Sequence, residues 1–328
     1  MRTTRILVVS GFSAFFKQGG GEVEAASLRQ ALQHQGFDAD LYGPDIFELD
    51  SYDLVIFFSC HSSGLELLET CKELGIKFMF WPNFWLEAEK SPSIAEVGLI
   101  NKFCLDTDAI VFKSETEKQM FQRFFDFNVG KSLMVDWFVD EDFGFGADKD
   151  KFKKLYGFDR YILSVGLIEP VKNQLLLVEA AAEANVSLVL IGGFRKKDYF
   201  EACLNAGKEH VTFIPHLPTK SPVISSAYAG CDAYAEVSYD PPGRSSIEAA
   251  LFAKPLILPS STWVDEIFPG MTNTMKPNDK TALVSALNNL SSLEKISAAQ
   301  SKGLKQKHSP QQALAKLLDY VHALRSGW

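Results

Sequence analysis

The sequence has no hydrophobic run long enough to cross a membrane. A transmembrane helix needs about eighteen or more apolar residues in succession, and no stretch of this 328-residue chain approaches that length. The apolar segment near the N-terminus, RILVVS, is too short for a signal peptide and has no small-residue cleavage site after it. We therefore expect a cytoplasmic protein.

A peripheral contact with the inner face of a membrane stays an open alternative. It rests on four residues that would form one apolar face of a helix, namely Met120, Phe121, Phe124 and Phe125. Apolar residues at this spacing are also what a helix buries against a protein core, and that interpretation is favoured.

Cysteine is scarce and shows no pattern of metal ligands. The five cysteines include no CxxC pair and no cluster with histidine at the spacing of a zinc site. Each lies in or beside a segment that we expect to be a strand or a helix. They are predicted to be buried, reduced thiols, without a disulfide framework or structural zinc.

Two common nucleotide-binding patterns are also missing. Gly19, Gly20 and Gly21 follow the first apolar run, but they do not form GxGxxG with an acidic residue about twenty positions on, which counts against an NAD or FAD site. No GxxxxGK[ST] motif is present, which excludes a P-loop NTPase. The glycine cluster either brings backbone close to a ligand or forms a flexible turn.

Positive charge is too thinly spread for nucleic-acid binding. The formal net charge is -8, and the acidic excess is confined to residues 1–147, which carry 12 basic and 23 acidic residues, against 21 and 18 in residues 148–328. Neither part has the basic stripe that phosphate-backbone binding needs. The asymmetry indicates either a solvated acidic surface or a small anion that binds to the second part.

Apolar runs alternate with helical patterns along the whole chain, which predicts an α/β fold. Such alternation is typical of right-handed βαβ units around a parallel sheet. It is interrupted by a polar, Gly-punctuated linker and then restarts. We expect two doubly wound, Rossmann-like domains facing across a ligand cleft. The expected strands are 5–10, 52–59, 76–81, 109–114, 161–166, 187–193, 211–216, 233–238 and 256–261, and the expected helices include 23–35, 64–75, 115–127 and 173–183.

Two acidic residues stand eight positions apart in EVSYDPPGRSSIEAALFAKP. Asp240 falls on a loop before a Pro-Pro-Gly turn, and Glu248 lies about a turn into the following helix. The carboxylates can accept hydrogen bonds from vicinal hydroxyls, and the helix N-terminus offers N–H groups to a phosphate. A solvated loop acid with an ordinary helix glutamate is the alternative for the pair taken alone.

Lys172 is placed just after the first strand of the second domain and just ahead of a helix. A lysine at this position can reach a diphosphate as a mobile point charge. An ordinary surface lysine is less favoured there, because a cation does not suit the start of a helix dipole.

These segments, taken together, resemble the retaining GT-B glycosyltransferases of the glycosyltransferase 4 type, also described as glycosyl transferases group 1. The similarity covers nearly the whole chain. It includes GGGEVEAASLRQALQHQGFDADLYG, which resembles the family's acceptor loop and helix, MVDWFVDEDF, which resembles its interdomain segment, and YILSVGLIEPVKNQ with the later strands of the nucleotide-sugar domain. The most specific part runs from Asp240 to Glu248 and resembles the family's two glutamates separated by seven residues.

The resemblance implies a role for each matched residue. Asp240 lies by the donor sugar, Glu248 accepts hydrogen bonds from the ribose, and Lys172 contacts the phosphates. Because protein cations then supply the positive charge, neither a metal nor a cofactor is expected. Catalysis is assigned to Asp240, Lys172 and Arg244, donor binding to Glu248, Gly243, Ser245, Ser246, Gly166, Gly192, Gly193 and Arg195, and the acceptor side to Gly19, Gly20, Gly21, His61, Trp81, Asn83 and Trp85.

Three positions differ from the family pattern. Leu167 stands where the family usually has arginine, and Arg244 or Arg195 is a candidate to replace that charge. Asp240 replaces a glutamate. The stretch Phe80–Trp85 replaces a segment with histidine, so that Trp81, Asn83 and Trp85 are a candidate wall for a sugar, with His61 as a substitute polar group. Core aromatics and a structural histidine are the alternatives.

The predicted domains are 1–147 on the acceptor side and 148–310 on the nucleotide-sugar side, with a final helix 311–328 that packs back on the first domain. The resemblance implies transfer of a sugar from a nucleotide-diphosphate sugar to a saccharide, lipid-linked or small-molecule acceptor, with retention and without metal. A GT-B nucleotide-sugar epimerase and a catalytically silent sugar-binding partner stay open. A periplasmic-type binding protein is disfavoured by the lack of a signal peptide.

Overall fold

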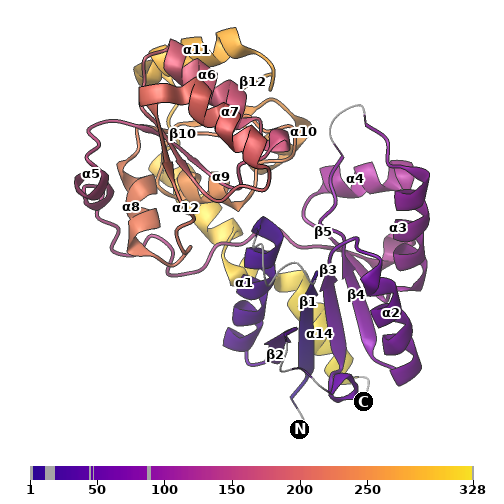
Figure 1. Cartoon of the computed structure of the whole chain (residues 1–328). Helices are drawn as coiled ribbons and strands as arrows, with labels where there is room; N and C mark the ends of the chain where they lie inside the picture. The colour runs from indigo at the N-terminus through magenta and orange to yellow at the C-terminus, as the bar shows by residue number, and fades with distance from the viewer. Residues whose placement is uncertain (1–2, 12–18, 44–45, 47, 87–89, 327–328) are drawn as a thin grey trace. The chain divides into compact units, whose positions relative to one another are not determined.

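The chain folds into two compact units, each built around a parallel six-stranded sheet (Figure 1). The computed structural model describes residues 3–11, 19–43, 46, 48–86 and 90–326. For residues 325 and 326 it describes the backbone alone. Unit 1 comprises Met1–Asp140 and Pro310–Trp328, and unit 2 comprises Glu141–Ser309. The expected α/β class, with two doubly wound domains, is confirmed.

The sheet of unit 1 has the strand order β2-β1-β3-β4-β5-β6. Its helices lie between consecutive strands, and α13 and α14 return from the end of the chain. The strands are β1 (Arg5–Ser10), β2 (Asp38–Leu41), β3 (Leu54–Phe58), β4 (Lys77–Trp81), β5 (Ala109–Phe112) and β6 (Ser132–Met134), and the helices are α1 (Gly20–His34), α2 (Ser63–Leu74), α3 (Ile94–Asp106), α4 (Glu115–Phe124), α13 (Pro310–Ala313) and α14 (Ala315–Ser326).

Both faces of this sheet are buried, because apolar residues occupy successive positions along its strands. Side chains alternate across a strand, so Ile6 and Val8 of β1 pack in one core cluster while Leu7 and Val9 pack in the other. The first cluster is completed by α1 and α14, the second by α2, α3 and α4 (Figure 1).

The sheet of unit 2 has the order β12-β11-β10-β7-β8-β9. The chain starts in the middle of this sheet with β7 and runs outward in both directions, so the direction reverses between β7 and β10. The strands are β7 (Ile162–Val165), β8 (Leu188–Ile191), β9 (Val211–Ile214), β10 (Ala233–Ala235), β11 (Leu256–Pro259) and β12 (Asn273–Met275), and the helices are α5 (Lys151–Tyr156), α6 (Gln174–Glu183), α7 (Lys197–Gly207), α8 (Pro222–Gly230), α9 (Arg244–Leu251), α10 (Thr262–Ile267), α11 (Lys280–Asn288) and α12 (Ala298–Lys307).

The first helix begins earlier than the sequence pattern predicts. It starts at Gly20 instead of Val23, because Gly19 is the N-cap residue and the Glu22 carboxylate accepts the Gly19 N–H at 2.7 Å. This contact, one half of a capping box, stabilises a turn that glycine by itself disfavours.

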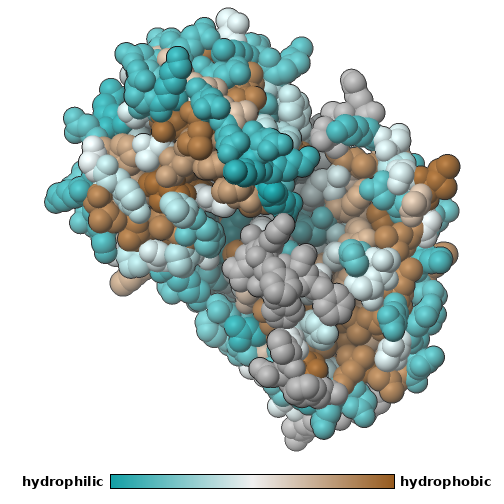
Figure 2. Space-filling model, viewed as in Figure 1, coloured by the Kyte–Doolittle hydropathy of each residue, from teal (hydrophilic) through white to brown (hydrophobic). Residues whose placement is uncertain are grey.

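The aromatic residues of α4 pack in the core. Phe121 and Phe125 are buried in the second cluster of unit 1, and Met120 and Phe124 pack against it. In the described part of the chain, every helix is too short or too polar to pass through a bilayer. Hydrophobic residues do reach the surface over α2 and α3 in Figure 2, where Leu74 and Leu105 are exposed.

Candidate functional site

Three charged residues of unit 2 meet where the direction of its sheet reverses. Lys172 ends the short 3-10 helix Pro170–Lys172 that follows β7. Glu236 follows β10 directly, and Asp240 lies in the loop beyond it. Since β7 and β10 are adjacent and parallel, their carboxyl ends lie at the same edge of the sheet. Doubly wound sheets bind their ligands at this switch point.

Lys172 lies between two carboxylates. Its Nζ is 3.0 Å from Asp240 Oδ2 and 3.3 Å from Glu236 Oε1. Burial alone would lower the pKa of the ammonium group, but the two carboxylates outweigh it and hold the pKa of Lys172 above its ordinary value. The lysine is therefore positively charged at physiological pH.

Asp240 has one carboxylate oxygen that no protein group satisfies. Oδ2 contacts Lys172, whereas Oδ1 is buried and has no hydrogen-bond partner among the described residues. Burial raises the pKa of Asp240, and the charge of Lys172 opposes this shift. Because an unpaired buried acceptor costs free energy, a ligand hydroxyl that donates to Oδ1 would stabilise this arrangement.

Glu236 was missed by the sequence reasoning, although it is the most connected carboxylate of the site. Its Oε1 accepts from Lys172 and from the Ser238 hydroxyl at 3.2 Å, and its Oε2 accepts from the Tyr234 hydroxyl at 3.1 Å and the Ser246 hydroxyl at 2.9 Å. The available signal was an acid directly after an apolar strand, at the same edge as Lys172.

Helix α9 brings its N-terminus to this edge. Gly243 is its N-cap residue, and no side chain caps the helix there. Such an end presents N–H donors and a partial positive charge, which favour a phosphate. Ser246, expected to line this opening, is fully buried and its hydroxyl is turned inward onto Glu236. Its backbone N–H donates to the Gly243 carbonyl at 3.1 Å. Ser245 accepts a hydrogen bond from the Tyr234 hydroxyl at 2.9 Å.

Glu248 is held from two sides inside the unit. Arg244 Nε donates to its Oε1 at 2.9 Å, and the Tyr228 hydroxyl donates to its Oε2 at 2.8 Å. The carboxylate is buried. Burial and the neighbouring Glu248 carboxylate raise the pKa of Tyr228, so this phenol stays a hydrogen-bond donor.

The glycines after β7 and β8 allow two backbone segments to approach closely. A Cβ on Gly192 would lie 1.9 Å from the Gly166 carbonyl oxygen, whereas one on Gly193 would reach no closer than 3.9 Å to Leu167. Nearby, Arg195 is half exposed and pairs with Glu169 at 3.0 Å. The guanidinium therefore already has a carboxylate partner.

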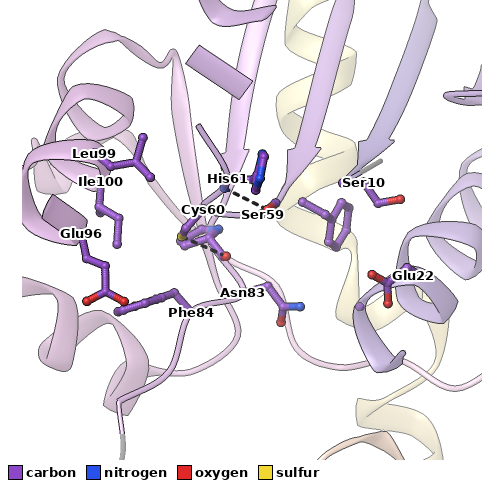
Figure 3. A pocket seen from close by; sticks show the side chains of 14 residues that line it. Ser10, Glu22, Ser59, Cys60, His61, Asn83, Phe84, Glu96, Leu99 and Ile100 are labelled. Atoms are coloured by element: carbon purple, nitrogen blue, oxygen red, sulfur yellow. Dashed lines mark hydrogen bonds between the residues drawn. The ribbon is translucent and has the colours of Figure 1, made fainter. Parts of the chain in front are cut away.

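Unit 1 contains a cavity of about 480 Å³ at the corresponding edge of its own sheet. Figure 3 shows residues from the ends of β1, β3 and β4 around it, together with α1 and α3. The lining residues are Ser10, Gly11, Gly21, Glu22, Phe58, Ser59, Cys60, His61, Pro82, Asn83, Phe84, Glu96, Leu99 and Ile100.

Three of the residues expected on the acceptor side, Gly21, His61 and Asn83, line this cavity. Gly19 and Gly20 form the start of α1 without lining it, and His61 Nδ1 lies 2.9 Å from the Ser63 hydroxyl.

The structure corrects the expectation for Trp81. Its ring is fully buried and stacks on Phe58 at a centroid distance of 4.4 Å, so it offers no face to a ligand. Trp81 is the last residue of β4, and its position in the alternation turns the side chain into the core. Trp85 is half buried beyond the strand and is not among the cavity-lining residues.

Comparisons with known proteins give one family match, over the second part of the chain, and one fold. Residues 147–307 match the family described as glycosyl transferases group 1. The structure is similar to a sucrose-phosphate synthase from Thermosynechococcus elongatus, with a TM-score of 0.81, 14% identity, and coverage of 99% of this chain and 100% of that one. No curated protein sequence matches.

Two further solved structures extend this comparison. Anabaena HepE in complex with UDP and glucose has a TM-score of 0.80 at 15% identity, covering 98% of this chain and 100% of that one. AviGT4, a glycosyltransferase involved in avilamycin A biosynthesis, has a TM-score of 0.66 at 14% identity, covering 99% of both chains. At such identities the similarity shows the fold, which is the GT-B fold.

Proposed function

We propose, from the match of residues 147–307 to the family described as glycosyl transferases group 1, that the protein transfers a sugar from a nucleotide-diphosphate sugar to a saccharide, lipid-linked or small-molecule acceptor. Unit 2 would bind the donor and unit 1 the acceptor. HepE has been solved in complex with UDP-glucose, which makes UDP-glucose the first donor to test.

The observation that carries this proposal is the unpaired Asp240 Oδ1 beside Lys172. In the proposed complex a sugar hydroxyl donates to that oxygen, and the Lys172 ammonium moves onto the diphosphate. The N-terminus of α9 binds the same phosphates through its backbone N–H groups. These groups stabilise the negative charge that develops on the leaving group, which is where electrostatic catalysis acts.

The charge balance of the site requires the cations to change partners. Among the described residues, Lys172 is paired with Glu236 and Asp240, and Arg244 is paired with Glu248, so each of these cations already has a carboxylate partner. A diphosphate must compete with these carboxylates.

Glu248 is the proposed anchor of the nucleotide ribose. Each carboxylate oxygen can accept more than one hydrogen bond, so the contacts from Arg244 and Tyr228 leave acceptor capacity for ribose hydroxyls. Those same contacts fix the carboxylate before the nucleotide arrives, which lowers the entropic cost of binding.

Transfer is proposed to proceed with retention and without metal. The sugar C1–oxygen bond to the diphosphate breaks, the acceptor oxygen bonds to C1 from the same face, and the acceptor proton passes to the leaving phosphate oxygen. The positive charge comes from Lys172, Arg244 and α9. Activity is expected to survive EDTA; its loss on chelation and return with Mg²⁺ would refute metal independence.

A donor panel tests the proposal directly. The purified protein is incubated with UDP-, GDP-, ADP- and dTDP-sugars, and released nucleotide is measured, since slow hydrolysis of the donor needs no acceptor. Asp240→Ala and Glu248→Ala should both abolish release. Asp240→Ala should leave the melting temperature within a few degrees, whereas Glu248→Ala should also lower it, because Arg244 and Tyr228 lose their buried carboxylate partner. If no nucleotide binds, the transferase proposal fails. Formation of a different nucleotide sugar would identify an epimerase instead.

A further inference from the structure

Unit 1 contains a buried lysine that the proposed reaction does not use. Lys113 follows β5 directly, and its side chain is only 3% exposed. Its Nζ lies 2.6 Å from Glu24 Oε2 on α1 and 2.8 Å from Asn83 Oδ1 after β4, and 5.2 Å from the centre of the Trp137 ring. Glu24 neutralises the lysine, so the cluster adds no net charge to this part of the unit.

This lysine fixes the orientation of the Asn83 amide. An ammonium group only donates hydrogen bonds, so the oxygen of the amide must face Lys113 and its NH2 group must face away. The nitrogen points toward α1 (Figure 3). There, a Cβ on Gly21 would lie 2.7 Å from Asn83 Nδ2. The backbone of Asn83 has φ 47°, which asparagine tolerates better than most residues.

Asn83 and Gly21 both line the 480 Å³ cavity. The cavity therefore has an oriented hydrogen-bond donor in one wall, made possible by a glycine opposite. Ser10, Ser59 and His61 add polar groups, and Phe58 and Phe84 add aromatic rings. A mixture of a few fixed polar groups with apolar walls is typical of small-molecule sites.

The charge of the cavity excludes one class of ligand. Its lining includes the carboxylates of Glu22 and Glu96, and no lysine or arginine among the residues that the structure describes. Hydrogen bonds from Ser93 lower the pKa of Glu96, which keeps it ionised. A phosphorylated or carboxylated molecule would meet two negative charges without a free cation to offset them.

We propose that this cavity binds an uncharged, polyhydroxylated acceptor, an unphosphorylated sugar or polyol, and that the Asn83 amide, held by Lys113, donates hydrogen bonds to one of its oxygens. The carboxylates of Glu22 and Glu96 accept from its hydroxyl groups. The proposal rests on the function proposed above, because it names the acceptor class of the same reaction. Lys113 is a positioning residue, since it acts through Asn83.

The close approach of Gly21 to the Asn83 amide is tested by substituting each residue alone and both together, with a second glycine of unit 1 as the control. Gly21→Ala should lower the melting temperature, because the new Cβ displaces an amide that Lys113 holds. Gly98→Ala on α3, where a Cβ meets nothing within 4 Å, is the matched control and should not. Asn83→Gly suits the positive φ and removes the amide, so Gly21→Ala should cost nothing in its presence. A Gly21→Ala effect that persists in the double variant overturns the proposed contact.

Ligand-observed NMR saturation transfer to the full chain tests the acceptor class. The probes are glucose, myo-inositol and glycerol, each paired with its monophosphate. Wild type and Gly98→Ala should bind at least one uncharged probe, and its phosphate about tenfold more weakly or not at all. Asn83→Gly should weaken binding about tenfold, as expected for one or two lost hydrogen bonds. Equal binding of the phosphates, no binding of any uncharged probe, or unchanged binding by Asn83→Gly would overturn the proposal.

UDP binding to the same samples separates this inference from the function itself. If UDP raises the melting temperature while no uncharged probe binds, the acceptor class is wrong and the donor site stands. If UDP and the other nucleotides fail to bind, the proposed function fails independently of what the cavity binds.

Discussion

Lys172 Nζ and Asp240 Oδ2 lie 3.0 Å apart and join the end of β7 to the loop after β10. The contact ties together two segments that are distant in sequence and adjacent in the sheet. It also leaves Asp240 with its second oxygen unpaired. The charge and geometry of the Lys172–Asp240 contact therefore determine what can bind at this edge of the sheet.

Asp240→Asn should bind UDP about fivefold more tightly while losing sugar transfer. The substitution removes one negative charge next to the diphosphate, worth about 1 kcal/mol for two charges about 4 Å apart with the full screening of water, and leaves Lys172 paired with Glu236. Isothermal titration with UDP and a nucleotide-release assay give the two values. Weaker UDP binding by the variant would mean that Lys172 does not bind the phosphates.

The same variant should show a pH-dependent gain in stability. The folded pKa of Asp240 is raised, so folding favours its protonated form, and this contribution is complete below the unfolded value of about 3.9. It is lost as pH rises through the folded pKa. Asp240→Asn keeps a neutral side chain at every pH. Its melting temperature relative to wild type should therefore rise between pH 4 and neutrality and then level off; a constant difference across that range would contradict the shift.

Glu236→Ala should destabilise unit 2 by about 3 kcal/mol, because it leaves the partly buried Lys172 with one carboxylate fewer and several buried hydroxyls without their acceptor. Chemical denaturation measures the loss. Glu209→Ala, which removes an exposed carboxylate 3.8 Å from His210, is the control and should cost close to nothing. Equal effects of the two changes would mean that the Glu236 network does not stabilise the fold.

Gly192→Ala should cost more than about 3 kcal/mol or prevent folding, since its Cβ would overlap the Gly166 carbonyl oxygen at 1.9 Å. Backbone cannot rotate aside as a side chain can. Gly193→Ala adds the same methyl group at the neighbouring residue, where the new Cβ would lie 3.9 Å from the Leu167 side chain, an ordinary contact distance. This variant should cost far less stability. The unfolding free energies of both variants check the comparison, and similar values would show that the β7 and β8 ends are free to separate.

The fold could be predicted because its signal is repeated along the chain. Each β-strand is a short apolar run between turns, and the alternation with helices leaves few topologies. Local boundaries were less predictable. The start of α1 at Gly20 depends on a contact between the Gly19 N–H and the Glu22 carboxylate, which a hydrophobic pattern does not include.

The site was predictable where a motif exists and not where partners come from elsewhere in the chain. The Asp240 to Glu248 pattern directed attention to the edge of the sheet where Lys172 and Asp240 meet. Glu236, Lys113 and Glu24 belong to no motif, and their roles depend on contacts across 64 and 89 positions of sequence. Trp81 was ambiguous because a strand-end aromatic points either inward or outward, and a shift of one residue decides which.

Because a protein is synthesised from its N-terminus, the packing of α14 determines when the core of unit 1 is completed. Leu314, Leu317 and Val321 complete the core that Ile6 and Val8 begin, whereas unit 2 is a single continuous stretch. A nascent chain can therefore finish unit 2 while unit 1 still lacks one wall. The strands of unit 1 are made before unit 2 but are fully buried after it, so a premature stop near residue 310 would leave an open hydrophobic surface on unit 1.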